Sequence, residues 1–476
     1  MKQRNKSFLY TASGLLLSAL LLLSCDSFLE VEERGKATIP SFLSDPNGLK
    51  AGLTGAYNTL YDYYNSEFGK YPDVAGNMVF LSVTSSQADM IDQYNYTSDP
   101  TQETGAVGHI WRKIFVTLSN VNNVIQYEPV VEAGYPTETD KCRNLLGQAL
   151  FMRALCHFDL CRVYAQPYNY TADASHLGVP ILTITPGPDD NVKRQSVKQV
   201  YDRILEDLGE ASKLLTDQVA ADAHYASLQA VNALYARVFL YMEDWQNALK
   251  YAKLTIGDQK LSQGDDYLRL FDDLTYQGEV ILRLSGQDLR GGLRSFYETS
   301  CVPADTLLSL YDKDDIRLKL LHRKDTVKCI KYQATKIPDN QPTRNDPFVF
   351  RLSELYLTAA EAAWNLGQYD VARNYIGAIV SRAVGEQRSN DILSECTDAN
   401  LIDLIRKERT KELCFEGHQF YDIIRWKQDL VREHKTNSIV KRMEYPNDYF
   451  VLPIPQAELN ANTNMQPNPT VNKQDS

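Results

Sequence analysis

The sequence feature that most constrains the fold is a row of carboxylates inside an apolar helical pattern. The segment LIDLIRKERTKELCFEGHQFYDIIRW occupies residues 401–426. Read as a helix, it begins with apolar residues on one stripe, and Glu408, Glu412 and Glu416 continue that stripe at helical spacing. An unpaired buried charge is very costly, so each of these carboxylates must find a cation or several hydrogen-bond donors.

Cations in the same segment are the first candidates for partners. Arg409 lies three residues before Glu412 and can meet it along a helix, and an arginine from another helix is the alternative. Gly417 is expected to end or bend the helix, and a second short helical piece follows it. We therefore expect a structural ion-pair network of Glu408, Arg409, Glu412, Glu416, Asp422 and Arg425. The alternative is that the glutamates form a catalytic acid/base pair, since paired charges also occur in active sites.

The same segment resembles the signature of the SusD/RagB family. Residues 408–426, ERTKELCFEGHQFYDIIRW, are similar to the family pattern ER..EL.FEG.R..D..RW, although Gln419 stands where an arginine is usual. The resemblance extends to CDSFLE at residues 25–30, FMRALCHFDLCRVYAQPY at 151–168 and YFVLPIPQAELNANTNMQPNP at 449–469. It implies a surface lipoprotein that binds nutrients, mostly glycans, beside an outer-membrane transporter.

The N-terminus has the pattern of a secretory signal with a lipid-attachment site. A short basic region precedes an apolar stretch that is too short to span a membrane, which takes about 20 residues. Leu22, Leu23, Ser24 and Cys25 then match a bacterial lipobox, in which the cysteine thiol accepts diacylglycerol. We expect a signal peptide at residues 1–24 and a lipidated tether at residues 25–45, anchored by its acyl chains. A plain signal followed by a chance cysteine is the alternative.

The charge and cysteine content of the chain argue against several classes of binding partner. The formal net charge is -11, and loss of the three positive charges of residues 1–24 would leave -14. This acidity argues against nucleic acid and against electrostatic adhesion to anionic lipid. The seven cysteines after Cys25 form no CxxC pair, so we expect free buried thiols and neither a metal nor another cofactor.

Helical patterns predict a mainly α fold, a tetratricopeptide-like scaffold with long loops and a few short strands. Two segments share an alanine, an aromatic residue nine positions later and an alanine three further on, as in tetratricopeptide helix pairs. They are Ala236, Trp245, Ala248 and Ala360, Tyr369, Ala372. We predict one domain at residues 46–476, with scaffold at about 46–260 and 347–430, an inserted loop and strand region at 261–346 and an extended tail at 445–476. Within the insertion, strands are expected at 279–284 and at 328–332, the latter beside 349–352.

Two regions are candidates for the ligand site. Residues 70–100 have few helix signals and are expected to be an ordered loop, which contains Asp89, Asp92, Tyr94 and Tyr96. An extended backbone would point both tyrosine rings the same way, as a platform for a sugar. The alternative is that both rings pack onto the scaffold. The inserted loop adds Arg290 and Tyr297.

The resemblance implies capture of an oligosaccharide and its delivery to a SusC-like TonB-dependent transporter. A peptide-binding member of the same family is an alternative, and so is a glycoside hydrolase that uses paired acids. We expect no enzyme, because the sequence contains no GxSxG, HExxH or Walker motif.

The lipobox makes a testable prediction about anchoring. The substitution Cys25→Ser should leave the protein folded but without acyl chains, because serine lacks the thiol that is acylated. Metabolic labelling with a fatty-acid analogue measures this, and label retained on the substituted protein would contradict the prediction.

Overall fold

The computed structural model of the chain describes residues 38–82, 89–187, 190–216, 222–287, 292–323, 326–338, 343–432 and 436–468. The chain divides into a first unit that ends at Phe42 and a second, compact unit that begins at Leu43. The described part of the first unit contains one helical turn, α2 (Ile39–Phe42). The predicted signal peptide and Cys25 lie outside the described residues. In the part that is described, no helix is long and apolar enough to cross a membrane.

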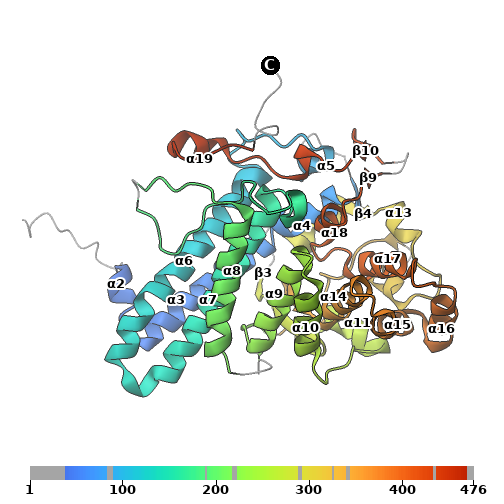
Figure 1. Cartoon of the computed structure of the whole chain (residues 1–476), viewed down its shortest axis with the longest axis horizontal. Helices are drawn as coiled ribbons and strands as arrows, with labels where there is room; N and C mark the ends of the chain where they lie inside the picture. Colours follow the sequence, from blue (N-terminus) through green and yellow to red (C-terminus); the bar gives the residue numbers. More distant parts are fainter. Residues whose placement is uncertain are drawn as a thin grey trace, which may run out of the picture. The chain divides into compact units, whose positions relative to one another are not determined.

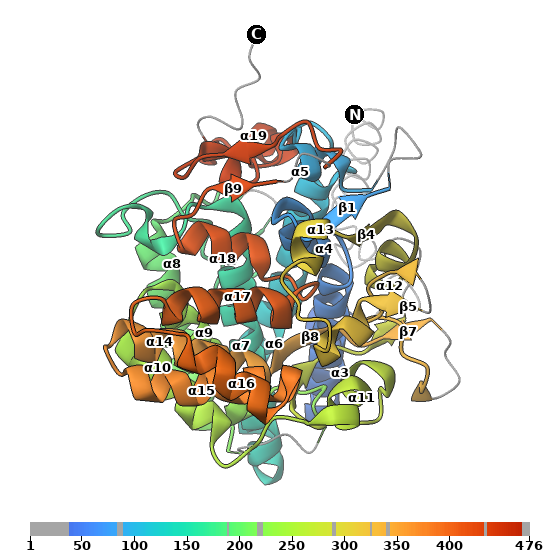
Figure 2. The same ribbon diagram turned by 90° about the vertical axis from the view of Figure 1, so that its right-hand side faces the viewer.

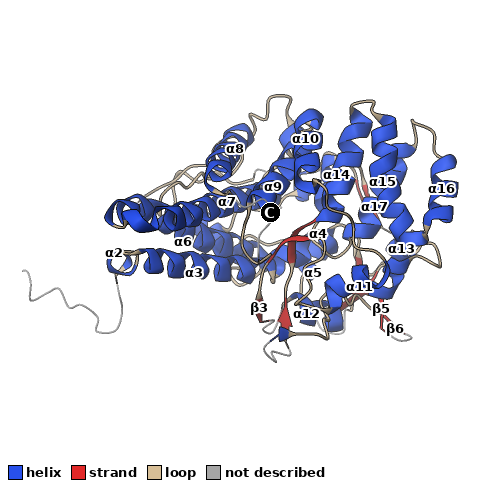
Figure 3. Cartoon of the chain, turned by 90° about the horizontal axis from the view of Figure 1, so that it is seen from below, coloured by secondary structure: helices blue, strands red, loops and turns tan. Residues whose placement is uncertain are grey.

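The predicted mainly α fold is confirmed, and the strands are short (Figures 1 and 3). The α-helices of the second unit are α3 (Pro46–Tyr64), α4 (Glu67–Ala75), α5 (Ile91–Asn95), α6 (Ala106–Gly134), α7 (Thr139–Tyr164), α8 (Val197–Leu214), α9 (Leu228–Tyr241), α10 (Trp245–Ile256), α11 (Gly264–Asp272), α12 (Leu293–Ser295), α13 (Asp305–Leu308), α14 (Leu352–Asn365), α15 (Tyr369–Val384), α16 (Glu386–Ser394), α17 (Leu401–Leu413), α18 (Gln419–Arg425) and α19 (Gln456–Ala461). The strands are β1 (Val79–Leu81), β2 (Val280–Arg283), β3 (Gly286–Gln287), β4 (Cys301–Pro303), β5 (His322–Arg323), β6 (Thr326–Val327), β7 (Arg344–Asn345), β8 (Phe348–Arg351), β9 (Leu430–Val431) and β10 (Arg442–Met443).

Local sequence signals fix the start of several helices. A proline opens α3, and the Asp45 carboxylate accepts hydrogen bonds from the backbone N–H groups of Asn47 and Gly48, each at 2.8 Å. At the start of α8, Ser196 and Gln199 form a reciprocal capping box. Each cap satisfies donors that the first helical turn leaves without partners.

The helices form two packed groups within the second unit. The long helices α3, α6, α7 and α8 contact one another in sequence along one side, seen on the left of Figure 1. The helix pairs α9–α10 and α14–α15 then stack through α10 and α14, and α17 packs on α14. The four repeat alanines predicted to allow this close approach are fully buried, namely Ala236, Ala248, Ala360 and Ala372. The two repeat aromatics open α10 and α15, directly after each turn.

The strands form isolated antiparallel pairs rather than one sheet. The predicted strand at 279–284 is observed as β2, which pairs with β8. The predicted strand at 328–332 is wrong, because these residues form a loop and a turn, and β8 pairs with β2. The expected loop at 70–100 is also wrong in part, since it contains α4, β1 and α5. The predicted extended tail contains one short helix, α19.

A buried ion-pair cluster joins α17 to the rest of the second unit. Its carboxylates come from Glu279, Asp315, Glu408, Glu412 and Glu416, and its cations come from Arg317, Lys331, Arg351, Arg382 and Lys411. We call these ten residues the neutral charge cluster, because five negative charges face five positive charges. Nine of the ten residues are at most 6% exposed, and the side chain of the tenth, Glu416, is 5% exposed.

Glu412 lies at the centre of the neutral charge cluster. Its carboxylate contacts Arg351 at 2.6 Å, Arg382 at 2.8 Å and Arg317 at 3.4 Å. Burial alone would raise the pKa of Glu412, but Arg382, Arg351 and Arg317 hold it well below its ordinary value. Glu416 lies beyond the end of α17, so it reaches Arg351 from a turn and not from the predicted helical stripe.

Arg409 has a different partner from the predicted Glu412. Its Nε donates to Asp422 at 2.8 Å, and Asp422 also accepts from Arg425 at 2.7 Å. Arg425 then pairs with Glu361 of α14. This second network ties α17 and α18 to α14, so the six predicted charged residues divide between two separate networks.

Loss of the central charge should destabilise the fold. The substitution Glu412→Gln leaves an excess positive charge in the core, and we expect the free energy of unfolding to fall by roughly 3–5 kcal/mol. The folded-state pKa of Glu412 is depressed, so its contribution is present above the unfolded pKa of about 4.3 and is lost as pH falls below it. Urea unfolding from about pH 2 to pH 7 measures both effects.

The matched control is Asp202→Asn, which removes the exposed Lys198–Asp202 pair of α8. A surface pair of this kind contributes about 0–1 kcal/mol. Equal destabilisation by the two substitutions would contradict a central role for Glu412.

Candidate functional site

The candidate site forms where three segments distant in sequence meet. After α4 the chain turns through Asn77, which has a φ of 63°, and enters β1. β1 pairs antiparallel with β4, and α13 follows β4 directly (Figure 2). The third segment, residues 436–440, lies against β1, because the Asn437 side chain donates to the carbonyl of Leu81 at 2.7 Å.

A cavity of about 300 Å³ lies between these segments, and we call it the β1–β4 cavity. This volume is within the range of small-molecule sites, roughly 300–1,000 Å³. Its wall combines apolar side chains with one amide, one carboxylate and several hydroxyl groups. The lining residues are Asn77, Val79, Phe80, Tyr94, Val302, Pro303, Ala304, Asp305, Thr306 and Thr436.

The polar groups of the β1–β4 cavity are held in place by one another. The Asn77 side-chain amide donates to the Thr306 hydroxyl and to the Val431 carbonyl, each at 3.2 Å. The Tyr94 and Thr436 hydroxyls lie 2.6 Å apart. Phe80 is the exposed ring among the lining residues, at 36% exposure, and the neighbouring Val79 and Leu81 of β1 are buried. A ring beside fixed hydrogen-bonding groups suits a ligand with both apolar and hydroxyl faces.

Arg432 supports the wall behind Tyr94. Its guanidinium group lies 4.4 Å from the centre of the Tyr94 ring and 5.4 Å from that of Tyr96. It also donates to the carbonyls of Val74 and Ala75 at the end of α4, at 3.2 and 3.3 Å. Burial lowers the pKa of Arg432, and the surrounding rings and carbonyls offset part of that cost.

The predicted tyrosine platform is wrong in its geometry. Residues 91–95 form the short helix α5, and Tyr96 follows with a φ of 56°, so no extended backbone aligns the rings. Tyr94 is fully buried and Tyr96 is 9% exposed. The alternative of rings packed onto the scaffold describes the structure. Tyr94 nevertheless lines the β1–β4 cavity.

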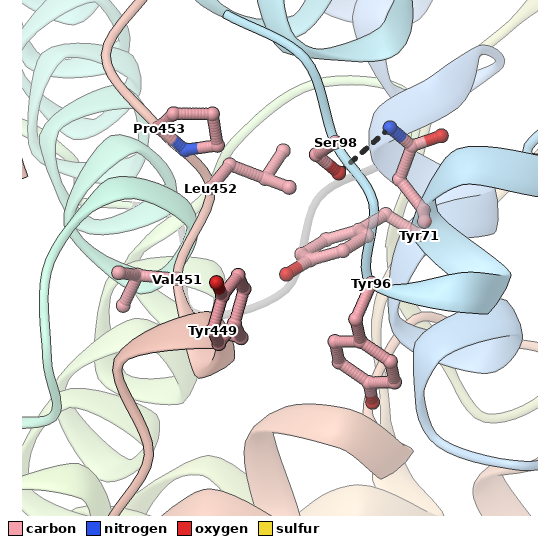
Figure 4. A pocket seen from close by; sticks show the side chains of 8 residues that line it. Tyr71, Tyr96, Ser98, Tyr449, Val451, Leu452 and Pro453 are labelled. Atoms are coloured by element: carbon pink, nitrogen blue, oxygen red, sulfur yellow. Dashed lines mark hydrogen bonds between the residues drawn. The ribbon is translucent and has the colours of Figure 1, made fainter. Parts of the chain in front are cut away.

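Tyr96 lines a second, much smaller space (Figure 4). The Tyr96 hydroxyl donates to the Ala75 carbonyl at 2.8 Å. The space beside it, lined also by Tyr71, Tyr449 and Leu452, measures about 10 Å³. That is about the volume of one water molecule, so the space is too small for a sugar.

The other predicted ligand residues have separate positions. Asp89 pairs with the buried Lys70 at 2.6 Å and does not line the β1–β4 cavity. Arg290 lies outside the described residues. Tyr297 is 1% exposed, so its predicted contact with a ligand is not supported by its position. Asp92 lies on α5, within the first turn of that helix.

Tyr297 instead donates to a buried carboxylate. Its hydroxyl lies 2.9 Å from Asp73, which also accepts from the backbone N–H groups of Phe415 and Gly417, at 3.1 and 3.3 Å. Burial raises the pKa of Asp73 to about 7, and Tyr297 and the two N–H groups lower it from a still higher value. Asp73 therefore joins α4 to the turn between α17 and α18.

Two family models match most of the chain. The model described as "SusD family" matches residues 323–470, and the model described as "Starch-binding associating with outer membrane" matches residues 27–240. The chain belongs to the SusD family. The SusD signature of residues 408–426 thus lies at the two buried charge networks.

Relatives and solved structures of the SusD family extend over nearly the whole chain. The SusD-like protein P38 of Formosa agariphila is 24% identical over 86% of this chain and 90% of that protein. A SusD superfamily protein of Bacteroides thetaiotaomicron is 26% identical, with a TM-score of 0.81 over 89% of this chain and 100% of that chain. A Bacteroides vulgatus protein described as "Putative sugar binding protein" is 26% identical, with a TM-score of 0.78 over 90% and 99%.

Sequence reasoning missed most of the residues that line the β1–β4 cavity. The short apolar run at residues 78–81, with the β-branched Val79 beside Phe80, was a usable signal for a strand. Thr306 and Thr436 carried no such signal, because hydroxyl residues are common in ordinary loops. Their place in the cavity depends on pairings with residues that are over two hundred positions away.

The contact with Asp73 predicts a structural role for Tyr297. The substitution Tyr297→Phe removes one of three donors and should lower the free energy of unfolding by about 1–3 kcal/mol. Both folded proteins hold Asp73 protonated at pH 5, so the loss should grow as pH rises through about 7. Denaturant unfolding at pH 5 and pH 9 measures this, with the exposed Tyr135→Phe as control. Equal loss at both pH values would contradict the assignment.

Proposed function

We propose that this SusD family member is a carbohydrate-binding protein of the outer membrane and that the β1–β4 cavity is its saccharide site. The observation that best supports this proposal is the exposed Phe80 ring, which lines a cavity with fixed polar groups. The description of the matching family, starch-binding and outer-membrane-associated, supports this, as does the similar Bacteroides vulgatus protein.

Sugars present C–H faces and hydroxyl rims, so their sites combine a flat ring with hydrogen-bonding groups. In this proposal the C–H face of one sugar unit packs against Phe80. The amide oxygen of Asn77 and the carboxylate of Asp305 accept hydrogen bonds from sugar hydroxyls. Because the Asn77 amide already donates to Thr306 and Val431, its oxygen is held in a fixed position and little entropy is lost on binding.

The proposal includes a place in the cell and a partner. Acyl chains on Cys25 would anchor the protein to the outer membrane, and the tether predicted at residues 25–45 would leave the folded unit outside the bilayer. The captured oligosaccharide would then pass to a SusC-like TonB-dependent transporter. Co-purification of the tagged protein with such a transporter tests this step, and its absence after mild detergent extraction would contradict it.

The glycoside hydrolase alternative receives no support from the carboxylates that suggested it. Glu408 and Glu412 are at most 2% exposed, and Glu416 is paired with the buried Lys331. None of the three lines the β1–β4 cavity. A general acid or base must reach its substrate. These side chains instead neutralise the core.

The saccharide site makes a direct prediction. The mature protein in detergent should bind oligosaccharides on a glycan array, with maltooligosaccharides as the first probe. For the best array ligand, Phe80→Ala should weaken binding about tenfold, because a ring contact and its buried area contribute on the order of 1.4 kcal/mol. Calorimetry measures the dissociation constant.

The control is Tyr135→Ala, which removes an exposed ring at the end of α6, outside the cavity. Its affinity should equal that of the unchanged protein. Unchanged affinity in Phe80→Ala would move the site elsewhere, and binding of peptides in place of saccharides would favour the peptide-binding alternative.

A further inference from the structure

Another cavity lies between α3 and α7, and no residue of β1 or β4 lines it. Its volume is about 390 Å³, and we call it the α3–α7 cavity. Leu53 of α3 and Leu145 of α7 form its apolar base, and both are buried. The cavity is large enough for a small ligand, and none of its lining residues belongs to the β1–β4 cavity.

Two aromatic rings form one wall of the α3–α7 cavity. Tyr57 and Tyr225 meet edge to face, with ring centres 5.5 Å apart and planes at 85°. The Tyr57 hydroxyl donates to Gln148 at 2.8 Å and accepts from the Ala226 N–H at 2.9 Å, so its ring is held rigidly. Tyr225 is 42% exposed and offers a ring to a ligand.

Two lysines give the cavity a positive rim. Lys50 of α3 and Lys141 of α7 both line it, and no carboxylate is among its described lining residues. Lys141 contacts Glu138 at 3.2 Å and Asn47 at 3.1 Å, so its charge is partly balanced. Lys50 makes no ion pair with any described residue. A cationic rim is unusual in a chain whose net charge is -11.

The polar group that completes the rim is Asn144. Its side-chain oxygen accepts from Gln148 at 2.7 Å, and Gln148 accepts in turn from Tyr57. This chain of hydrogen bonds directs the Asn144 oxygen toward Gln148 and leaves its amide hydrogens to serve as donors. The cavity thus offers cations and a donor at its rim and apolar rings in its wall.

We propose that the α3–α7 cavity is a second binding site, for an acidic saccharide that carries carboxylate or sulfate groups. The sugar ring would pack against Tyr225, and Lys50 and Lys141 would bind the anionic group. This inference takes from the proposed function only the ligand class. It adds a second site with a different charge preference, since the β1–β4 cavity has an acid and no lysine among its lining residues.

An anionic membrane surface could also meet two lysines. The cavity favours a saccharide, because a flat lipid surface would not use a recessed pair of rings with an apolar base. Vesicles of phosphatidylglycerol distinguish a membrane surface from an acidic saccharide.

The experiment measures binding of three oligosaccharides to the mature protein in detergent by calorimetry. Tetragalacturonate carries carboxylates, a sulfated dextran oligosaccharide carries sulfates, and maltotetraose is neutral. At least one acidic probe should bind, and its affinity should fall as salt is raised. Tyr225→Ala and the double substitution Lys50→Gln/Lys141→Gln should each weaken that binding at least about fivefold.

Two control variants separate this site from the other. Lys198→Gln removes an exposed lysine of α8, outside the cavity, and should leave affinity unchanged. Phe80→Ala should also leave binding of the acidic probe unchanged. If the unchanged protein binds an acidic probe but not maltotetraose, the result counts against the β1–β4 site and not against this one.

Three results would overturn the proposal. They are no binding of either acidic probe at about millimolar concentration, acidic-probe binding that survives both cavity variants, and acidic-probe binding that is lost in Phe80→Ala. Lysine-dependent binding of phosphatidylglycerol vesicles, with no binding of the acidic oligosaccharides, would reassign the lysines to a membrane contact.

Discussion

Charge balance inside the second unit is the constraint on which the rest of the structure depends. Five carboxylates and five cations of the neutral charge cluster share one water-excluded region. A buried ion pair costs desolvation energy that its own attraction does not always repay, but removal of one partner leaves a charge that costs far more. The ten residues come from α17 and the turn after it, the inserted region, β8 and α15, so the charge pairs hold these elements against one another.

That arrangement also positions the loops of the β1–β4 cavity. The turn between α17 and α18 places the N–H groups of Phe415 and Gly417 on Asp73, which lies in α4. The end of α4 is held by Arg432 from the segment after α18. The cavity then forms where the chain leaves α4. Binding residues commonly lie on loops that a rigid scaffold holds in position.

The sequence predicted what depends on local periodicity and on resemblance. Spacing alone predicts the mainly helical fold, the alanines of the two repeat pairs and the buried charged residues of α17. The partners of Glu412 do not, because Arg351 and Arg317 are 61 and 95 residues away and only positions three or four apart can be paired by spacing. The tyrosine platform failed for a related reason. The prediction places Tyr94 and Tyr96 on an extended backbone with both rings on the same side. In the structure Tyr94 lies in α5 and Tyr96 in a left-handed turn, and both rings pack against Arg432.

Hydrogen–deuterium exchange on the mature protein, free and bound to its best array saccharide, tests the central claim most directly. The claim is that a charge-balanced core holds a rigid scaffold while the loops of the β1–β4 cavity bind the ligand. Residues 77–82 and 301–306 should gain protection on binding, and residues 408–416 should exchange slowly in both states. Protection confined to other segments, or rapid exchange at residues 408–416 in the free protein, would contradict it.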